Sequence, residues 1–412
     1  MQSSNASINP LSPNAPLWSL GFRPFFLLGA LISVVLMITW PMFYRGIAPV
    51  PSVNVFSWHG HEMIFGYTIA IIAGFLLTAV RNWTGLNTAS QSSLMGLALL
   101  WLLPRFSPVF AAIAPDLLLP LQILDLLFIP ALAFAIGVPI IKSKNWRNLV
   151  IVFMLVAFTV LHLAYYLAEW KSQNILFSDA SNFISYSTNQ PLMLALELIM
   201  VLIALIGARV LPMFTRNGTK KFGADQVQPK SYERAPWLLM GLGFLQLFSQ
   251  LLPWSIVNTL ICFAFALALL INLAGWQGKA LWKTPLLWVI HIGYFGVATG
   301  FIFKGLAQLD IVAQSVWIHT MALLAVGMMT LGFIGRVSLG HTGRALEATP
   351  IMVTSYFFML AAAVIRIAAA FPIVATAMPV TGLWDFAALC WSIAMLLFVI
   401  KFTKIMLLPR PA

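Results

Sequence analysis

Residues 192–207 read LMLALELIMVLIALIG, and Glu197 is the one charged side chain in this run. The predominantly apolar pattern extends over 190–212, which matches the roughly 20 residues that a helix needs to cross a bilayer core about 30 Å thick. Lipid offers no hydrogen-bond partner to backbone N–H and C=O groups, so a spanning segment of this kind must be helical. The run therefore predicts a transmembrane helix with a carboxylate inside it.

The same pattern recurs along the whole chain. Hydrophobic residues make up 61% of the sequence and charged residues 8%, whereas an ordinary soluble domain carries about 25% charged residues. No soluble fold of this length could bury so much apolar surface, so the predicted fold class is all-α: a polytopic membrane protein with twelve transmembrane helices in two sets of six. The expected spans lie near 24–44, 57–80, 92–110, 117–141, 148–169, 190–212, 236–252, 255–276, 284–306, 313–335, 350–370 and 382–408.

The domain organisation follows from the polar intervals. The longest of them, 216–235, separates the two sets of helices, and no sequence repeat relates one set to the other. We expect a polar cytoplasmic tail over 1–23 and a single transmembrane domain over 24–412, with helices 1–6 at 24–212, a cytoplasmic loop at 213–235 and helices 7–12 at 236–408.

The basic residues set the expected orientation, because Lys and Arg concentrate in cytoplasmic loops. With a cytoplasmic N-terminus and an even number of helices, most of the 23 Lys and Arg residues fall on the inner side. This asymmetry explains the net charge of +12 without a nucleic-acid partner and predicts that both termini are cytoplasmic. The basic residues expected on the outer side are Arg45, Arg105, Lys171 and Lys304.

The segment WHGHEM, residues 58–63, contains the sharpest motif. On a regular helix, positions i and i+2 point about 200° apart, so His59 and His61 cannot easily bind one metal ion together. We expect them to serve different partners. The spacing alone is a weak pattern, and the alternative is an interfacial histidine pair satisfied by Glu62 or by backbone groups.

Further ionisable side chains fall in the outer half of the expected bundle. Such groups are costly in a bilayer, so each is a functional candidate. Carboxylates beside histidines suit metal ligation with a supply of protons, and Glu62 and Glu197 are the candidate catalytic residues for that role. The alternative is a set of interhelical hydrogen bonds, and Asp125 is a weaker candidate. The outer histidines are His59, His61, His162 and His319.

A second group lies toward the cytoplasmic face, where His291 and His341 are candidate metal ligands. Guanidinium groups bind carboxylates through two parallel hydrogen bonds, so arginines nearby are candidates for holding a cofactor's carboxylates or another anion. The alternatives are positive-inside anchoring of the helix ends and, for Arg366, extension of the side chain to the membrane surface. The candidate cofactor-binding residues are Arg209, Arg336 and Arg344 in this group, and Arg366, a weaker candidate within the expected span at 350–370.

Several stretches, in order along nearly the whole chain, carry a family resemblance. They are 21–26 (GFRPFF), 58–66 (WHGHEMIFG), 74–85 (GFLLTAVRNWTG), 209–217 (RVLPMFTRN), 291–294 (HIGY) and 340–344 (GHTGR). With them the sequence resembles the NnrS family of bacterial inner-membrane haem proteins linked to nitric-oxide stress. Arg81 stands where an uncharged residue is expected, a departure that leaves the site residues untouched.

The resemblance implies a twelve-helix protein of the bacterial inner membrane that binds haem, for which we expect the b type, with copper or a second haem as a further candidate. It also implies protection against nitric oxide, as ligand or substrate. We interpret the protein as an oxidoreductase similar to nitric oxide reductases, supplied by an electron donor that the sequence does not name. Haem iron held by one histidine would leave a position open to the gas.

Two other classes remain open. One is a twelve-helix transporter coupled to protons through His and Glu residues, and the other is a haem-bearing sensor or accessory protein. A haem Soret band separates the enzyme from the transporter, and turnover of nitric oxide by the isolated protein separates the enzyme from the sensor.

Overall fold

The computed structural model describes residues 9, 12–48, 50, 52, 54–173, 188–222, 229–230, 232–250, 255–276 and 278–411. Within these residues every regular element is a helix. Eleven helices are long and apolar enough to cross a membrane. The prediction of a polytopic all-α membrane protein is confirmed.

The first half of the chain supplies six of these crossings, and some consist of consecutive helical elements. They are α1 (Phe22–Tyr44); α2, η2 and α3 (Val55–His61, Glu62–Thr68, Ile69–Thr84); α4, η3 and α5 (Gln91–Leu102, Leu103–Phe106, Ser107–Ile113); η4 and α6 (Pro115–Leu117, Leu118–Lys142); η5 and α7 (Trp146–Asn148, Leu149–Ser172); and α8 (Asn189–Thr219).

The second half contributes five long crossings and one shorter helix, α9 (Ala235–Ser249). The long crossings are α10 (Ser255–Ala274); α12 (Pro285–Gln308); α13, η7 and α14 (Gln314–His319, Thr320–Gly327, Met328–His341); α15 (Pro350–Ala368); and α17 (Val380–Leu407). The short elements are η1 (Pro16–Trp18), η6 (Lys220–Phe222), α11 (Lys279–Trp282) and α16 (Pro372–Ala377).

The first and last crossings of the bundle meet on one side of the molecule. Arg23, at the start of α1, donates hydrogen bonds from Nη1 to the carbonyl oxygens of Met406 and Leu408 at the end of α17, both at 2.8 Å. An even number of crossings is needed to bring these ends together, and α9 is the described helix that could supply a twelfth. This helix has 15 residues. A helix of that length reaches only about 22 Å, at a rise of about 1.5 Å per residue, so the count of twelve stays a prediction.

Helix α8 extends further than the expected span. The sequence predicts a cytoplasmic loop that begins at residue 213, but α8 continues to Thr219. Pro212 lies inside this helix without ending it, because neighbouring helices in a membrane bundle can satisfy the backbone groups that a proline frees.

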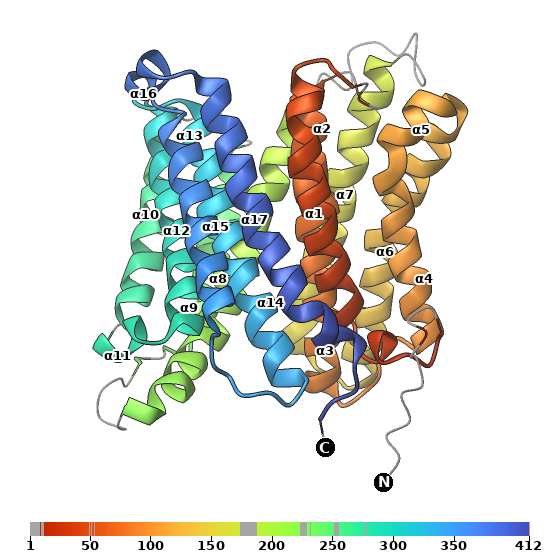
Figure 1. Ribbon diagram of the computed structural model, residues 1–412. Coiled ribbons are helices and arrows are strands. Elements are labelled where there is room, and N and C mark those ends of the chain that lie inside the picture. The colour runs from red at the N-terminus through yellow and green to blue at the C-terminus, as the bar shows by residue number, and fades with distance from the viewer. Residues whose placement is uncertain are drawn as a thin grey trace.

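The helices divide into two groups, visible in Figure 1. The elements α1 to α7 gather on one side and α9 to α15 on the other, while α17 packs along α1 and also along α15. Helix α8 contacts both α7 and α9, so it also connects the groups. The crossing that carries His319 packs very closely against α12. A Cβ atom added at Gly293 of α12 would lie only 2.7 Å from the backbone N of Met329. Small residues allow such contacts between membrane helices.

Two crossings contain a π-helical segment, and each begins directly after a histidine. The η2 segment follows His61, and the η7 segment follows His319. Insertions of this type shift the helix face by about one residue and occur often at functional sites. Two of the three crossings with outer histidines therefore share an uncommon local geometry.

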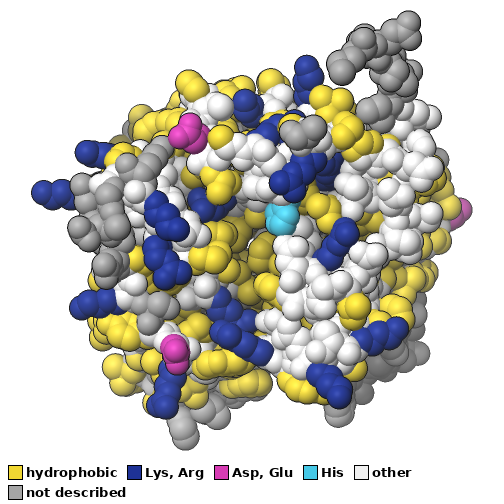
Figure 2. Space-filling view, turned by 90° about the horizontal axis from the view of Figure 1, so that it is seen from below, with side chains coloured by type: hydrophobic (Ala, Val, Ile, Leu, Met, Phe, Trp, Pro, Cys, Tyr) yellow, Lys and Arg dark blue, Asp and Glu magenta, His cyan; other side chains and the backbone are white. Residues whose placement is uncertain are grey.

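The end of the bundle that carries the start of α1 and the end of α17 is rich in Lys and Arg, which surround a hollow with apolar walls in Figure 2. The orientation remains a prediction with a direct test. Alkaline phosphatase fused within 216–234 should be inactive, because we expect that segment in the cytoplasm, whereas the same reporter fused after Lys171 should be active. The reverse pattern would contradict the positive-inside argument.

Candidate metal centre

Three helices of the first half bring His61, Asp125 and His162 together. They lie at the end of α2, in α6 and in α7, and each is at most 2% exposed. The two imidazole Nε2 atoms are 2.9 Å apart, and Oδ2 of Asp125 lies 3.4 Å from His61 Nε2 and 3.6 Å from His162 Nε2. Three ligand atoms that suit a metal ion therefore converge on one point.

The spacing of these atoms fits metal ligation. Histidine nitrogen and carboxylate oxygen bind Zn²⁺ at about 2.0–2.2 Å, and an ion at about 2.05 Å from each atom would see the pairs at angles of about 90° to 120°. Two histidines and one carboxylate on one side of an ion leave further positions open, which is typical of non-haem iron sites. The arrangement can hold an ion and still admit a small ligand.

A neighbouring carboxylate and guanidinium orient these ligands. His61 Nδ1 lies 3.1 Å from Oε1 of Glu62, so a proton on Nδ1 leaves the lone pair of Nε2 directed at the site. Arg105 donates from Nη1 to Oε2 of Glu62 at 2.6 Å and from Nη2 to Oδ1 of Asp125. Tyr166 donates to Oδ2 of Asp125 at 2.9 Å.

The charges of this cluster do not cancel. With neutral imidazoles, Glu62 and Asp125 supply two negative charges and Arg105 one positive charge, all within the membrane and all at most 6% exposed. A buried uncompensated charge is strongly unfavourable. The cluster therefore favours the uptake of positive charge, which a metal ion or a proton bound within the cluster would supply.

Arg105 is buried, which its assignment to a side of the membrane did not predict. The sequence places it among the outer-side basic residues, and its side chain is buried in the 3₁₀ turn η3, which connects α4 and α5. Lys304, also expected outside, is buried too and pairs with Glu197. The signal for Arg105 in the sequence is the Pro104–Arg105 pair, which lies inside an otherwise apolar run.

Aromatic rings hold the two imidazoles in place. Phe65 stacks on His162 with ring centres 4.1 Å apart and an angle of 10° between planes. Tyr165 stacks on His61 at 4.6 Å and 23°. These rings restrict rotation of both ligands and exclude water from the site, which strengthens electrostatic interactions there.

A separate cavity lies on another side of α2. His59, His319 and Arg366 line it, with Trp40, Trp384 and Trp391 among its walls, and it leaves about 130 Å³ of space. The ring of His59 stacks on Trp40 at 4.1 Å. The cavity draws its lining from α1, α2, α8, α13, α15 and α17, so it lies where the two groups of helices meet.

The cavity presents one imidazole as a lone-pair donor and one guanidinium as an anion binder. His319 Nδ1 donates to the carbonyl of Ser315 at 2.8 Å, which leaves Nε2 unprotonated in the neutral ring. Arg366 contacts Ser315 at 3.4 Å and lies over the ring of Trp384. Among the described residues no carboxylate forms an ion pair with Arg366.

His59 and His61 thus belong to different groups, and Gly60 between them packs against Leu192. Glu197 lies apart from both sites in its contacts: Oε1 accepts from Lys304 at 2.5 Å and Oε2 from Gln250 at 2.7 Å. With both oxygens engaged, Glu197 has the environment of a structural ion pair.

The inner residues do not form one group among the described contacts. His291 donates from Nδ1 to the carbonyl of Leu287 at 2.8 Å and has Thr215 Oγ1 at 3.2 Å from Nε2, whereas His341 lies against the ring of Phe22. The arginines are also dispersed: Arg336 lies over Phe214, Arg344 donates to the carbonyl of Thr342, and Arg209 donates to Asn148.

The fold and these contacts define a polytopic helical membrane protein with a buried histidine–carboxylate cluster. A sequence model of one family, described as NnrS protein, matches residues 16–410. The chain belongs to the NnrS family, which confirms the resemblance found in its sequence. No curated protein matches the chain.

Proposed function

We propose that this protein is a haem-containing metalloprotein of the bacterial inner membrane that protects against nitric oxide by reducing or otherwise consuming it. The observation that supports this most is the placement of imidazoles that can bind metals in two sites flanking one helix, one site buried with a carboxylate and the other opening on a cavity. An unknown donor would supply the electrons.

The residues of the cavity fit a haem by their chemistry. The free Nε2 of His319 suits iron, because a backbone hydrogen bond at Nδ1 fixes the ring orientation. Arg366 lacks an ion-pair partner among the described carboxylates, so it suits a propionate. Tryptophans and aliphatic residues supply apolar walls. His59 supplies a second imidazole to this cavity. To admit the haem ring, side chains in the cavity wall would have to move and widen the space.

The chemistry that haem iron supplies when bound is coordination and one-electron reduction of a diatomic gas. The protein's own contribution is positional. His319 and His59 face the cavity, Arg366 compensates anionic charge there, and the walls exclude water. On the other side of Gly60, the pair of Glu62 and His61 can hold or release a proton at Nδ1 beside the metal centre.

For the triad of His61, Asp125 and His162 we propose iron or copper, since imidazole suits both metals and an open side is needed for a gas. The competing function is proton-coupled transport, which the same cluster supports if a proton rather than a metal ion supplies its missing positive charge. The two functions therefore differ in what neutralises the cluster.

The test is the absorption spectrum of the purified protein with its histidine variants. We expect a Soret band in the wild type and its loss or shift in His319→Ala, with a similar effect in His59→Ala. His291→Ala is the matched control, because both ring nitrogens of His291 have partners within the protein, and its spectrum should be unchanged. A protein without haem after expression with adequate haem supply would contradict the proposed enzyme.

A further inference from the structure

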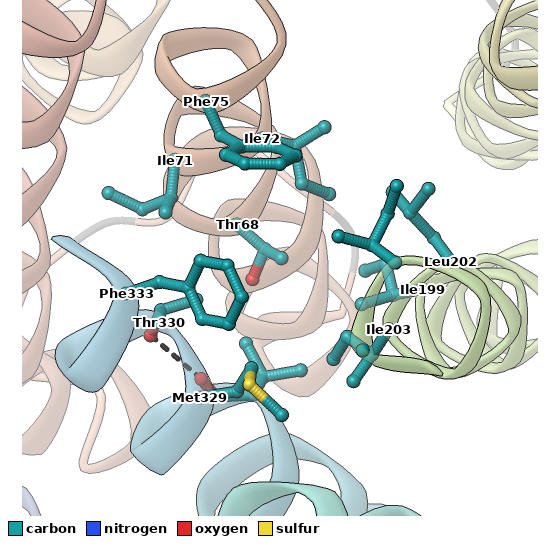
Figure 3. A pocket seen from close by; sticks show the side chains of 13 residues that line it. Thr68, Ile71, Ile72, Phe75, Ile199, Leu202, Ile203, Met329, Thr330 and Phe333 are labelled. Carbon is teal, nitrogen blue, oxygen red and sulfur yellow. Dashed lines mark hydrogen bonds between the residues drawn. The ribbon is translucent and has the colours of Figure 1, made fainter. Parts of the chain in front are cut away.

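A second cavity lies between α3, α8 and α14 (Figure 3). Aliphatic and aromatic side chains from the three helices point into it, and it leaves about 80 Å³ of space. Part of its lining is deeply buried, since Ile71 is 4% exposed, Ile199 1% and Val326 3%. Ile72, Phe75, Ile203 and Phe333 are partly exposed, so the cavity has an open side. The residues that line it are Thr68, Ile71, Ile72, Phe75, Ile199, Leu202, Ile203, Ile206, Gly207, Val326, Met329, Thr330 and Phe333.

The two hydroxyl groups in this lining are already engaged. Thr68 Oγ1 donates to the carbonyl of Met63 at 2.7 Å, and Thr330 Oγ1 donates to the carbonyl of Val326 at 2.7 Å and contacts the hydroxyl of Tyr67 at 2.8 Å. The cavity therefore offers a polar ligand almost no free hydrogen-bonding group. Walls of this kind favour apolar molecules such as xenon over polar ligands.

The apolar cavity lies next to the histidine cavity along the same three crossings. On each crossing, a residue that lines the histidine cavity is followed three or four positions later by one that lines the apolar cavity. On the α-helix α8, residues at this spacing share one face and lie about one turn or about 5.4 Å apart. The other two pairs lie in the π-helical segments η2 and η7, where a turn takes more residues. The pairs are Ile64 and Thr68, Leu196 and Ile199, and Leu323 and Val326.

We infer that this cavity binds small apolar gas molecules and holds nitric oxide beside the histidine cavity. Nitric oxide is a neutral diatomic molecule, so it needs no hydrogen bond and fits the space, whereas a lipid carries a head group for which the lining has no partner. The naming of nitric oxide rests on the proposed function. The binding of an apolar gas rests only on the walls.

The experiment uses xenon as the probe, in crystals of the full-length protein pressurised with the gas. Xenon should give an anomalous peak between α3, α8 and α14. Ile203→Trp places a larger side chain in the cavity and should remove the peak. Ile199→Phe is a second variant that fills the cavity with a smaller ring, and it should also weaken the peak. The control is Ile271→Phe, because Ile271 is 58% exposed on α10 and lies outside the cavity; the peak should persist there.

Absence of the xenon peak in the wild type would overturn the inference, as would a lipid chain or a cofactor ring occupying the space. The xenon measurement needs neither haem nor turnover of nitric oxide, so a negative result there is distinct from failure of the proposed function. In haem-loaded protein, flash photolysis should show fewer rapidly rebinding nitric oxide molecules in Ile203→Trp than in Ile271→Phe. Equal rebinding, with xenon still bound in the wild type, would reject nitric oxide as the cavity's ligand.

Discussion

His162→Ala should lose the metal ion proposed for the site of His61, Asp125 and His162, whereas His291→Ala should keep it. His162 contributes one of three converging ligand atoms, and even substitutions outside the ligand set lower metal affinity by about 10- to 100-fold. Removing a ligand should cost on the order of 100-fold or more. Metal content of purified protein, measured by mass spectrometry after dialysis against a weak chelator, gives the result directly.

The control is matched in burial, since His162 is 1% and His291 2% exposed. Asp125→Asn is a second variant that preserves shape and removes the carboxylate charge, and it should also lose metal. Equal metal content in His162→Ala and His291→Ala would reject the centre. A wild type that folds and inserts without metal would favour the transporter.

Arg105→Leu should be among the most destabilising single substitutions in the described part of the chain. Arg105 joins the carboxylates of Glu62 and Asp125 in a site from which water is excluded. Breaking a buried ion pair by removing one partner costs about 3–5 kcal/mol, because the remaining charge is left uncompensated. The free energy of unfolding in mixed micelles, measured by denaturant titration, should fall by about that amount.

Arg45→Leu is the control, because it also breaks an ion pair between an arginine and an aspartate, Asp385. That pair is partly exposed, with side-chain exposures of 42% for Arg45 and 32% for Asp385. Exposed ion pairs contribute little, so this variant should unfold almost as the wild type does. If Arg105→Leu does not fold, the triple variant with Glu62→Gln and Asp125→Asn should recover folding, because it removes the uncompensated charges. No recovery, or no loss of stability in Arg105→Leu alone, would contradict the assigned role.

The positions of residues along the membrane were predictable because they depend on local properties. Hydropathy over about 20 residues marks a crossing whatever its neighbours are, and the expected spans correspond to the eleven long helices and to α9. The direction of a side chain on its own helix is also local. An angle of about 200° between His59 and His61 follows from the helical repeat, and the two residues lie in different groups of contacts.

What sequence could not provide is the arrangement of helices around one another. Grouping by depth placed His61 with His319 and Glu197, but His61 contacts His162 and Asp125, whereas Glu197 contacts Lys304. Depth is set by the residue's distance from the end of its own helix. The neighbour is set by which helices pack together and how each is rotated, and both depend on contacts between distant parts of the chain.

The sequence by itself thus determined the class of protein, its membrane segments, its family and the histidines that merit attention. Only the tertiary structure decided that Asp125 joins His61 and His162, that Arg105 lies inside with them, and that His59, His319 and Arg366 share a cavity. The physical reason is the range of the forces involved. Transfer of apolar residues into lipid acts on each segment separately, while packing and buried electrostatics act between segments and select one arrangement among many with the same hydropathy.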